Sequence, residues 1–279
     1  MAEVTRTVKE SGGDYTSLIS WESGEQTDLP SAGDTHTVTC DPFEEDGGAT
    51  EFNLTGWETD ASHYVTIQGT DFPAMPWSSG STYTYRSSTS GKVFIIRENY
   101  TRVKKLQVLA DAGGSAQYGL WVIYTDGCLV EDVYIKVESG GDSAGFKGFG
   151  FSGGYGGESG EARNVIVWND NNSPTSTSAG FSVGSYSFTS TIDLYNCLSF
   201  YSGESNDVWG FYAQDSAPTV NLYNCVTFNA GTDVESIDSA TTCATDLGSS
   251  SSNLPGSGHV YYLSDVWKSS STGDFEPDD

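Results

Sequence analysis

Hydrophobic and polar residues alternate along several short segments of this chain, and two of these segments are nearly identical. Residues 194–200 read LYNCLSF, and residues 222–228 read LYNCVTF. Apolar residues recur at every second position, with Ile192, Leu194, Leu198 and Phe200 in one phase, which predicts strands with one buried face. β-branched and aromatic residues dominate both segments and favour strands over helices.

The repeat continues upstream in weaker form. Each copy of the repeat carries an acidic or amide residue at the equivalent position: Asp132, Asn164, Asn196 and Asn224. A glycine followed by an apolar residue precedes each of these positions: Gly119, Gly148, Gly180 and Gly210. A β-unit of about 30 residues that repeats without helices is typical of a solenoid. We therefore expect an all-β fold, a right-handed parallel β-helix.

Stacking of the coils would place the acidic and amide residues in one column, which the alternation predicts to point inward. Stacked side-chain amides can hydrogen-bond from one coil to the next. We interpret Asp132, Asn164, Asn196 and Asn224 as a structural ladder, with a metal or catalytic role for Asp132 as the alternative.

Turn-rich segments divide the chain into regions. A short helix near residues 14–22, with Asp14 or Thr16 as its N-cap, is expected to close the first coil. The regions are an N-terminal cap over 1–60, coils over 61–247 with outward loops at 70–91 and 140–160, and a linker, C-terminal strand and acidic tail over 248–279.

The charge balance excludes some classes of partner. The 279 residues include 38 acidic and 12 basic side chains, for a formal net charge of −26. Nucleic-acid and membrane-surface binding both rely on clustered Lys and Arg, so neither is expected. No segment approaches the ~20 apolar residues of a membrane span. The first residues also lack the pattern of a secretory signal peptide, unless a tag has replaced one.

The five cysteines are an odd number, so they cannot all pair. Cys197 and Cys225 occupy equivalent positions of the repeat and should be neighbours on adjacent coils. We expect a stack of reduced thiols there, with a disulfide as the alternative. No Cys and His spacing indicates zinc.

Carboxylates in register on adjacent coils would indicate sugar chemistry, because charge must converge on one sugar. Asp193 aligns with Glu161 on one side and Asn221 on the other, so three carboxylates do not line up. Arg97, Arg102 and Arg163 are the available bases, and none repeats beside an acid pair. We therefore predict no catalytic residue, no metal ligand and no cofactor, and leave Ca²⁺ open.

Outward-facing aromatic residues are the better functional clue. Tyr195 and Tyr223 lie in the phase opposite to the core and should stack on adjacent coils, with Tyr201 and Trp77 adding to them. Exposed stacked aromatics indicate a sugar platform or a subunit interface. The alternative is that a loop covers them.

The N-terminal region carries a family resemblance. The segment GGDYTSL at 12–18 and the segment LTGWETDASHYVTI at 54–67 resemble the opening of right-handed β-helix proteins of the pectate-lyase-like superfamily, many of which occur in tailed bacteriophages. The resemblance implies the fold. It leaves function open, because the group includes lyases, hydrolases, receptor-binding spikes and inert virion components.

These observations together favour a non-enzymatic structural protein of the virion. The expected role is a bacteriophage capsid decoration or cement protein, a homotrimer bound to the major capsid protein, made in the host cytoplasm and released by lysis. The alternatives are a polysaccharide lyase or hydrolase and a glycan-binding spike.

Overall fold

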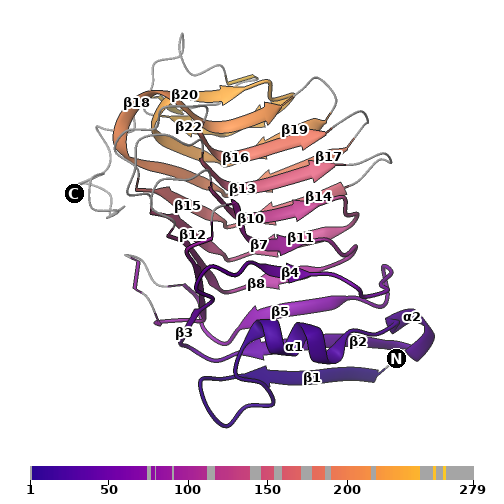
Figure 1. The fold of residues 1–279 in the computed structure, drawn as a ribbon. Helices are drawn as coiled ribbons and strands as arrows, with labels where there is room; N and C mark the ends of the chain where they lie inside the picture. The colour runs from indigo at the N-terminus through magenta and orange to yellow at the C-terminus, as the bar shows by residue number, and fades with distance from the viewer. Residues whose placement is uncertain are drawn as a thin grey trace.

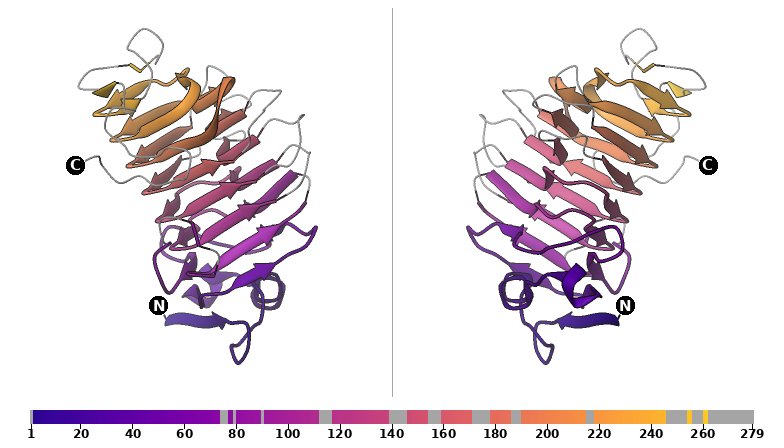
Figure 2. Two further views of the ribbon diagram at one scale, coloured as in Figure 1. Left: turned by 90° about the vertical axis from the view of Figure 1, so that its left-hand side faces the viewer. Right: turned by 90° about the vertical axis from the view of Figure 1, so that its right-hand side faces the viewer.

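The chain forms a right-handed parallel β-helix. The computed structural model describes residues 2–73, 77–78, 80–89, 91–111, 117–138, 146–153, 159–170, 178–185, 190–214, 218–245, 254–255 and 260–261. Figure 1 shows the coils stacked from the N-terminal end, in indigo, to the orange and yellow coils near the other end, and Figure 2 shows the same stack from both sides. The predicted fold class is confirmed.

Three faces run along the stack. The first is a parallel sheet of nine strands: β1 (Ala2–Val8), β2 (Asp34–Cys40), β5 (Val65–Gly69), β8 (Arg102–Lys104), β11 (Cys128–Glu131), β14 (Ser159–Arg163), β17 (Thr191–Tyr195), β19 (Thr219–Tyr223) and β21 (Ser239–Thr241).

The second face follows the first after a tight turn. Its strands are β3 (Glu44–Asp46), β6 (Thr84–Ser87), β9 (Gln107–Ala110), β12 (Tyr134–Val137), β15 (Ile166–Asn169), the start of β18 (Leu198–Gln214), the start of β20 (Val226–Glu235), β22 (Ala244–Thr245) and β23 (Val260–Tyr261).

The third face completes each coil. Its strands are β4 (Phe52–Leu54), β7 (Gly91–Ile96), β10 (Gln117–Ile123), β13 (Phe146–Gly153), β16 (Ser178–Ser185), the end of β18 and the end of β20. Because β18 and β20 run without a break from the second face to the third, the two faces join into one sheet of hydrogen bonds.

The turn between the first and second faces explains the acidic and amide column. Asp132, Asn164, Asn196 and Asn224 have φ of 53–57°, the left-handed region that Asn and Asp tolerate best. Their side chains form a hydrogen-bonded ladder with donor–acceptor distances of 2.9, 3.1 and 3.2 Å from coil to coil. The predicted inward orientation was wrong: these residues lie at a corner and are exposed or half-buried.

The same turn breaks the alternation that the sequence predicts. Leu194 and Cys197 both belong to the main core, whereas Phe200 packs with Phe228 in a separate cluster outside it. The residue at positive φ shifts the strand phase by one position, so Leu198 and Phe200 were wrongly placed in the phase of Leu194.

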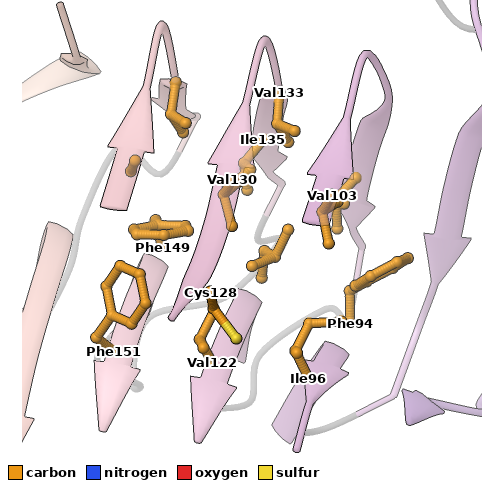
Figure 3. Close-up of a cluster of buried hydrophobic side chains, with 14 of the residues drawn as sticks. Phe94, Ile96, Val103, Val122, Cys128, Val130, Val133, Ile135, Phe149 and Phe151 are labelled. Atoms are coloured by element: carbon orange, nitrogen blue, oxygen red, sulfur yellow. The ribbon is translucent and has the colours of Figure 1, made fainter. Parts of the chain in front are cut away.

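The core lies between the three faces. Figure 3 shows part of it, where Phe94, Val122 and Phe149 of the third face lie in one cluster with Val103 and Val130 of the first. The Gly–apolar pairs of the sequence are in register, since Leu120, Phe149, Phe181 and Phe211 stack on consecutive coils. All five cysteines are buried, and none of them forms a disulfide.

Two glycines of these pairs allow the second and third faces to approach closely. A Cβ at Gly119 would overlap Ile135 Cγ2, and a Cβ at Gly148 would overlap Val167 Cγ1. Since Ile135 and Val167 are fully buried, neither can move aside without disturbing the core.

The N-terminal region contains both helices of the described residues and the first strands. Helix α1 (Leu18–Glu25) has Ser17 as its N-cap rather than Asp14 or Thr16, and α2 (Leu29–Ala32) follows. β1 pairs in parallel with β2, and β2 with β5, so the stack begins at residue 2 rather than at 61. No helix in the described ranges is long and apolar enough to cross a membrane.

Both predicted outward loops contain a coil strand. β6 lies within 70–91 and pairs with β3 and β9, while β13 lies within 140–160 and pairs with β10 and β16. The remaining parts of these segments, 74–76, 79, 90, 140–145 and 154–158, lie outside the described residues, as do residues 262–279, which include the acidic tail.

Candidate functional site

The aromatic pair expected from the repeat lies on the first face. Tyr195 and Tyr223 point outward from β17 and β19, with ring centroids 4.6 Å apart and planes 9° from parallel. The Arg163 guanidinium lies 5.7 Å from the Tyr195 centroid. Both tyrosines are half-buried.

The other two aromatic candidates do not extend this pair. Tyr201 is 1% exposed and donates its hydroxyl to the Trp209 carbonyl at 2.8 Å, so its predicted role at an exposed surface was wrong. Trp77 packs edge-on against Tyr134, with centroids 4.9 Å apart, beside the second face.

A larger feature, which the sequence did not reveal, lies on the outer surface of the third face. It is a cleft of about 290 Å³ that crosses the strands from β7 to β18. Its described lining consists of Lys92, Arg97, Tyr118, Trp121, Ile123, Tyr124, Lys147, Ser152, Ser182, Gly184 and Gln214. None of these side chains is Asp or Glu.

Small residues form the floor of the cleft. Gly150 and Ser182 are in register with Trp121 and Tyr212, and a Cβ at Gly150 would overlap the Trp121 ring, which therefore lies over the strand. Ser182 is 1% exposed, and its Oγ has no hydrogen-bond partner within the described part of the chain. A buried hydroxyl without a partner costs stability, and a bound polar group would recover that cost.

Aromatic rings lie around Lys147, and two of them, Tyr118 and Trp121, line the cleft. Tyr118 and Trp121 meet at 4.6 Å and 73° on β10, and Tyr212 stacks on Trp209 at 4.5 Å on β18. Rings of this kind offer flat apolar faces with polar edges.

Lys147 lies at the centre of the cleft. Its Nζ is 5.9, 5.7 and 5.9 Å from the centroids of Tyr118, Trp121 and Tyr212, and it donates to Gln214 Oε1 at 3.3 Å. Burial lowers the pKa of this ammonium group, because the charged form loses hydration. The three rings compensate part of that loss through cation–π attraction.

Two further cations lie on the β7 side. Lys92 Nζ is 5.4 Å from the Tyr118 centroid, and Arg97 Nε donates to Asn53 Oδ1 at 3.2 Å. Neither they nor Lys147 forms an ion pair within the described residues, although the chain carries a net charge of −26. Other cations do form ion pairs: Arg6, Lys9, Arg86, Lys104, Lys136 and Arg163.

The acidic residues weighed in the sequence lie elsewhere. Glu161, Asp193 and Asn221 are in register on the first face, and Asn221 Nδ2 donates to Asp193 Oδ1 at 2.9 Å. The described residues contain no cluster of His, Cys, Asp and Glu that could hold a metal ion. Arg97 was one of the three bases named from the sequence, and it lies at the cleft.

Comparison with known proteins supports the fold alone. No protein-family model matches the sequence, and no curated protein does. The structure is similar to pectin methylesterase PemA from Erwinia chrysanthemi, with a TM-score of 0.50 and 8% identity over 98% of each chain. Rice weevil pectin methyl esterase is also similar, with a TM-score of 0.43 and 10% identity over 91% of this chain and 87% of that one. These proteins are carbohydrate-active β-helix enzymes.

Proposed function

We propose that this protein binds an acidic glycan in the cleft on its third face. Glycan binding was one of the alternatives drawn from the sequence, with Tyr195 and Tyr223 as the binding surface. The present proposal keeps the ligand class but places the site on the third face instead of the first. The observation that carries it is Lys147, a half-buried ammonium group among three aromatic rings that has no carboxylate partner among the described residues.

The missing partner indicates an anionic ligand. A desolvated cation is costly unless a counter-charge neutralises it. Because the rest of the protein is strongly acidic, a cleft with three cations attracts an anion to one place on an otherwise repelling surface.

The rest of the lining indicates that the anion is a sugar derivative. Trp121 and Tyr118 provide apolar ring faces against which the C–H faces of a sugar can pack. Ser182 and Gln214 provide hydrogen-bonding groups for hydroxyls. The similarity to carbohydrate-active β-helix enzymes is consistent with a glycan ligand.

Calorimetry with acidic oligosaccharides, prepared from polygalacturonate, alginate and hyaluronan, would test this proposal against neutral dextran fragments. Lys147→Gln should weaken binding by about 10- to 100-fold, the value of one hydrogen bond to a charged group. Lys104→Gln is the matched control, because Lys104 carries the same charge but pairs with Glu131 at 2.9 Å on the first face. Equal weakening by both variants, or binding of dextran alone, would overturn the proposal.

The capsid decoration role, the homotrimer and the virion location stay predictions. Mass spectrometry of purified particles, with this chain counted against the major capsid protein, would test them. A glycan-binding cleft is compatible with a protein carried on such a particle.

A further inference from the structure

The side chains across the cleft follow an order from strand to strand. Lys92 of β7, Tyr118 of β10 and Lys147 of β13 are in direct register. Neighbouring parallel strands lie about 4.8 Å apart, so the two lysines start about 9.6 Å apart, with an aromatic ring between them.

The two ammonium groups approach the same pair of rings from strands on opposite sides of β10. Lys92 Nζ lies 5.4 and 5.8 Å from the centroids of Tyr118 and Trp121, and Lys147 Nζ lies 5.9 and 5.7 Å from them. Lys147 Nζ also reaches Gln214 of β18, two strands further along the stack, whereas Arg97 follows the end of β7 on the Lys92 side. An anion held from β7 and an anion held from β13 would therefore lie on opposite sides of Tyr118.

The positions beyond Lys147 in this register are neutral. β16 places Ala179 next to Lys147, and β18 places Trp209 next to Ala179. On the next strand, Thr232 is in register with Trp209. A carboxylate bound past Lys147 would meet no cation among the described residues of this row.

The advance per sugar in an extended polysaccharide is close to the spacing between strands. A chain lying along the cleft, across the strands, would place one sugar over each coil. Successive sugars would then meet Lys92 of β7, Tyr118 of β10, Lys147 of β13 and the neutral Ala179 of β16.

We propose that the ligand is a polysaccharide in which acidic and neutral sugars alternate, bound across the strands with its acidic residues at Lys92 and Lys147. This inference rests on the proposed function and specifies the class of glycan. Tyr118 receives the neutral sugar between two acidic ones, and the next neutral sugar lies over Ala179.

Calorimetry with fragments of equal length would test the alternation. Hyaluronan fragments, in which glucuronate alternates with N-acetylglucosamine, should bind at least about 10-fold more tightly than oligogalacturonate, which carries a carboxylate on every sugar. Lys92→Gln should weaken fragments with two or more carboxylates and leave those with one carboxylate unchanged. Lys147→Gln should weaken both kinds, and Lys104→Gln neither.

The outcomes separate this inference from the proposed function. Equal or tighter binding of oligogalacturonate would overturn the alternation while the acidic-glycan proposal stands. Weakening of single-carboxylate fragments by Lys92→Gln would overturn the two separate positions. Failure of every acidic fragment to bind would overturn the proposed function, and this inference with it.

Discussion

Lys147 shows how one residue can carry both a stability cost and a binding function. Burial among Tyr118, Trp121 and Tyr212 lowers its pKa below the ordinary 10.5. Folding disfavours the charged form of Lys147. The charge therefore destabilises the folded protein at pH values below the folded pKa, and this destabilisation disappears as the pH rises from the folded pKa to the unfolded value of 10.5.

As the pH rises, anion binding at Lys147 should therefore be lost at a lower pH than anion binding at an ordinary lysine. The charged ammonium group is the form that binds, so affinity for an acidic oligosaccharide should fall by half at a pH below 10.5. Lys147→Arg should move this midpoint upward, because a guanidinium group stays charged. Calorimetry from pH 7 to 11 measures both, with Lys104→Arg as the control. Identical midpoints for the wild type and Lys147→Arg would show that another group sets the pH dependence.

Among the elements of the fold, the glycine column determines how closely the second and third faces can pack. Gly148→Ala would drive a methyl group into Val167, which is fully buried. We expect a loss of about 1–3 kcal/mol in the free energy of unfolding, the usual cost of overpacking. Urea denaturation would measure it.

Gly184→Ala is the matched control for this prediction. Gly184 also lies in a strand of the third face, but the nearest atoms to an added Cβ are 3.8 Å away, an ordinary contact. The free energy of unfolding of the Gly184→Ala variant should differ from that of the wild type by less than about 0.5 kcal/mol. A similar loss for both variants would mean that glycine is needed for its backbone freedom rather than for the close approach.

The repeat made much of the fold predictable at this scale. Glycines before Leu120, Phe149, Phe181 and Phe211 predicted a register that the structure has. The phase after each ladder residue was not predictable from alternation, because a single residue at positive φ shifts it. Phe200 therefore lies outside the main core, although it follows the apolar pattern of Leu194.

The cleft was harder to predict than the fold. Lys92 and Lys147 lie on different coils, and although Lys147 directly precedes the Gly148–Phe149 pair, Lys92 precedes no such pair; the stacking brings both to one surface. The sequence held one indication of the cleft. Small residues, Gly150 and Ser182, occupy outward positions at which the neighbouring coils carry Trp121 and Tyr212. The Gly–apolar repeat aligns these four residues, because each directly follows the apolar residue of its pair, but the alignment does not show that they border a cleft.

At the scale of the whole molecule, the stack needs a closed N-terminal end. Glu25, the last residue of α1, joins several segments there. Its Oε1 accepts hydrogen bonds from Arg6 Nε of β1 and from Tyr15 Oη, both at 2.6 Å, and its Oε2 lies 3.2 Å from His36 Nε2 of β2. Trp21 and Trp57 pack around His36, so these contacts hold the helix against the first two strands.

Glu25 should make the stability of this end depend on acid pH. Burial opposes its ionisation, but the hydrogen bonds from Arg6, Tyr15 and His36 outweigh burial and lower its pKa from 4.5 to about 2. A carboxylate whose pKa is lowered by folding stabilises the protein above its unfolded value, and the effect is lost as the pH falls from 4.5 toward 2.

Glu25→Gln should therefore lower the free energy of unfolding by about 1.5–3 kcal/mol at pH 7, the value of hydrogen bonds to a charged group. The difference from the wild type should narrow between pH 4.5 and pH 2, because protonation removes the same charge from Glu25. Glu10→Gln removes an exposed charge from the same region and should change stability little at either pH. Urea denaturation across this pH range measures all three proteins, and a difference that stays constant with pH would show that Glu25 contributes through packing rather than charge.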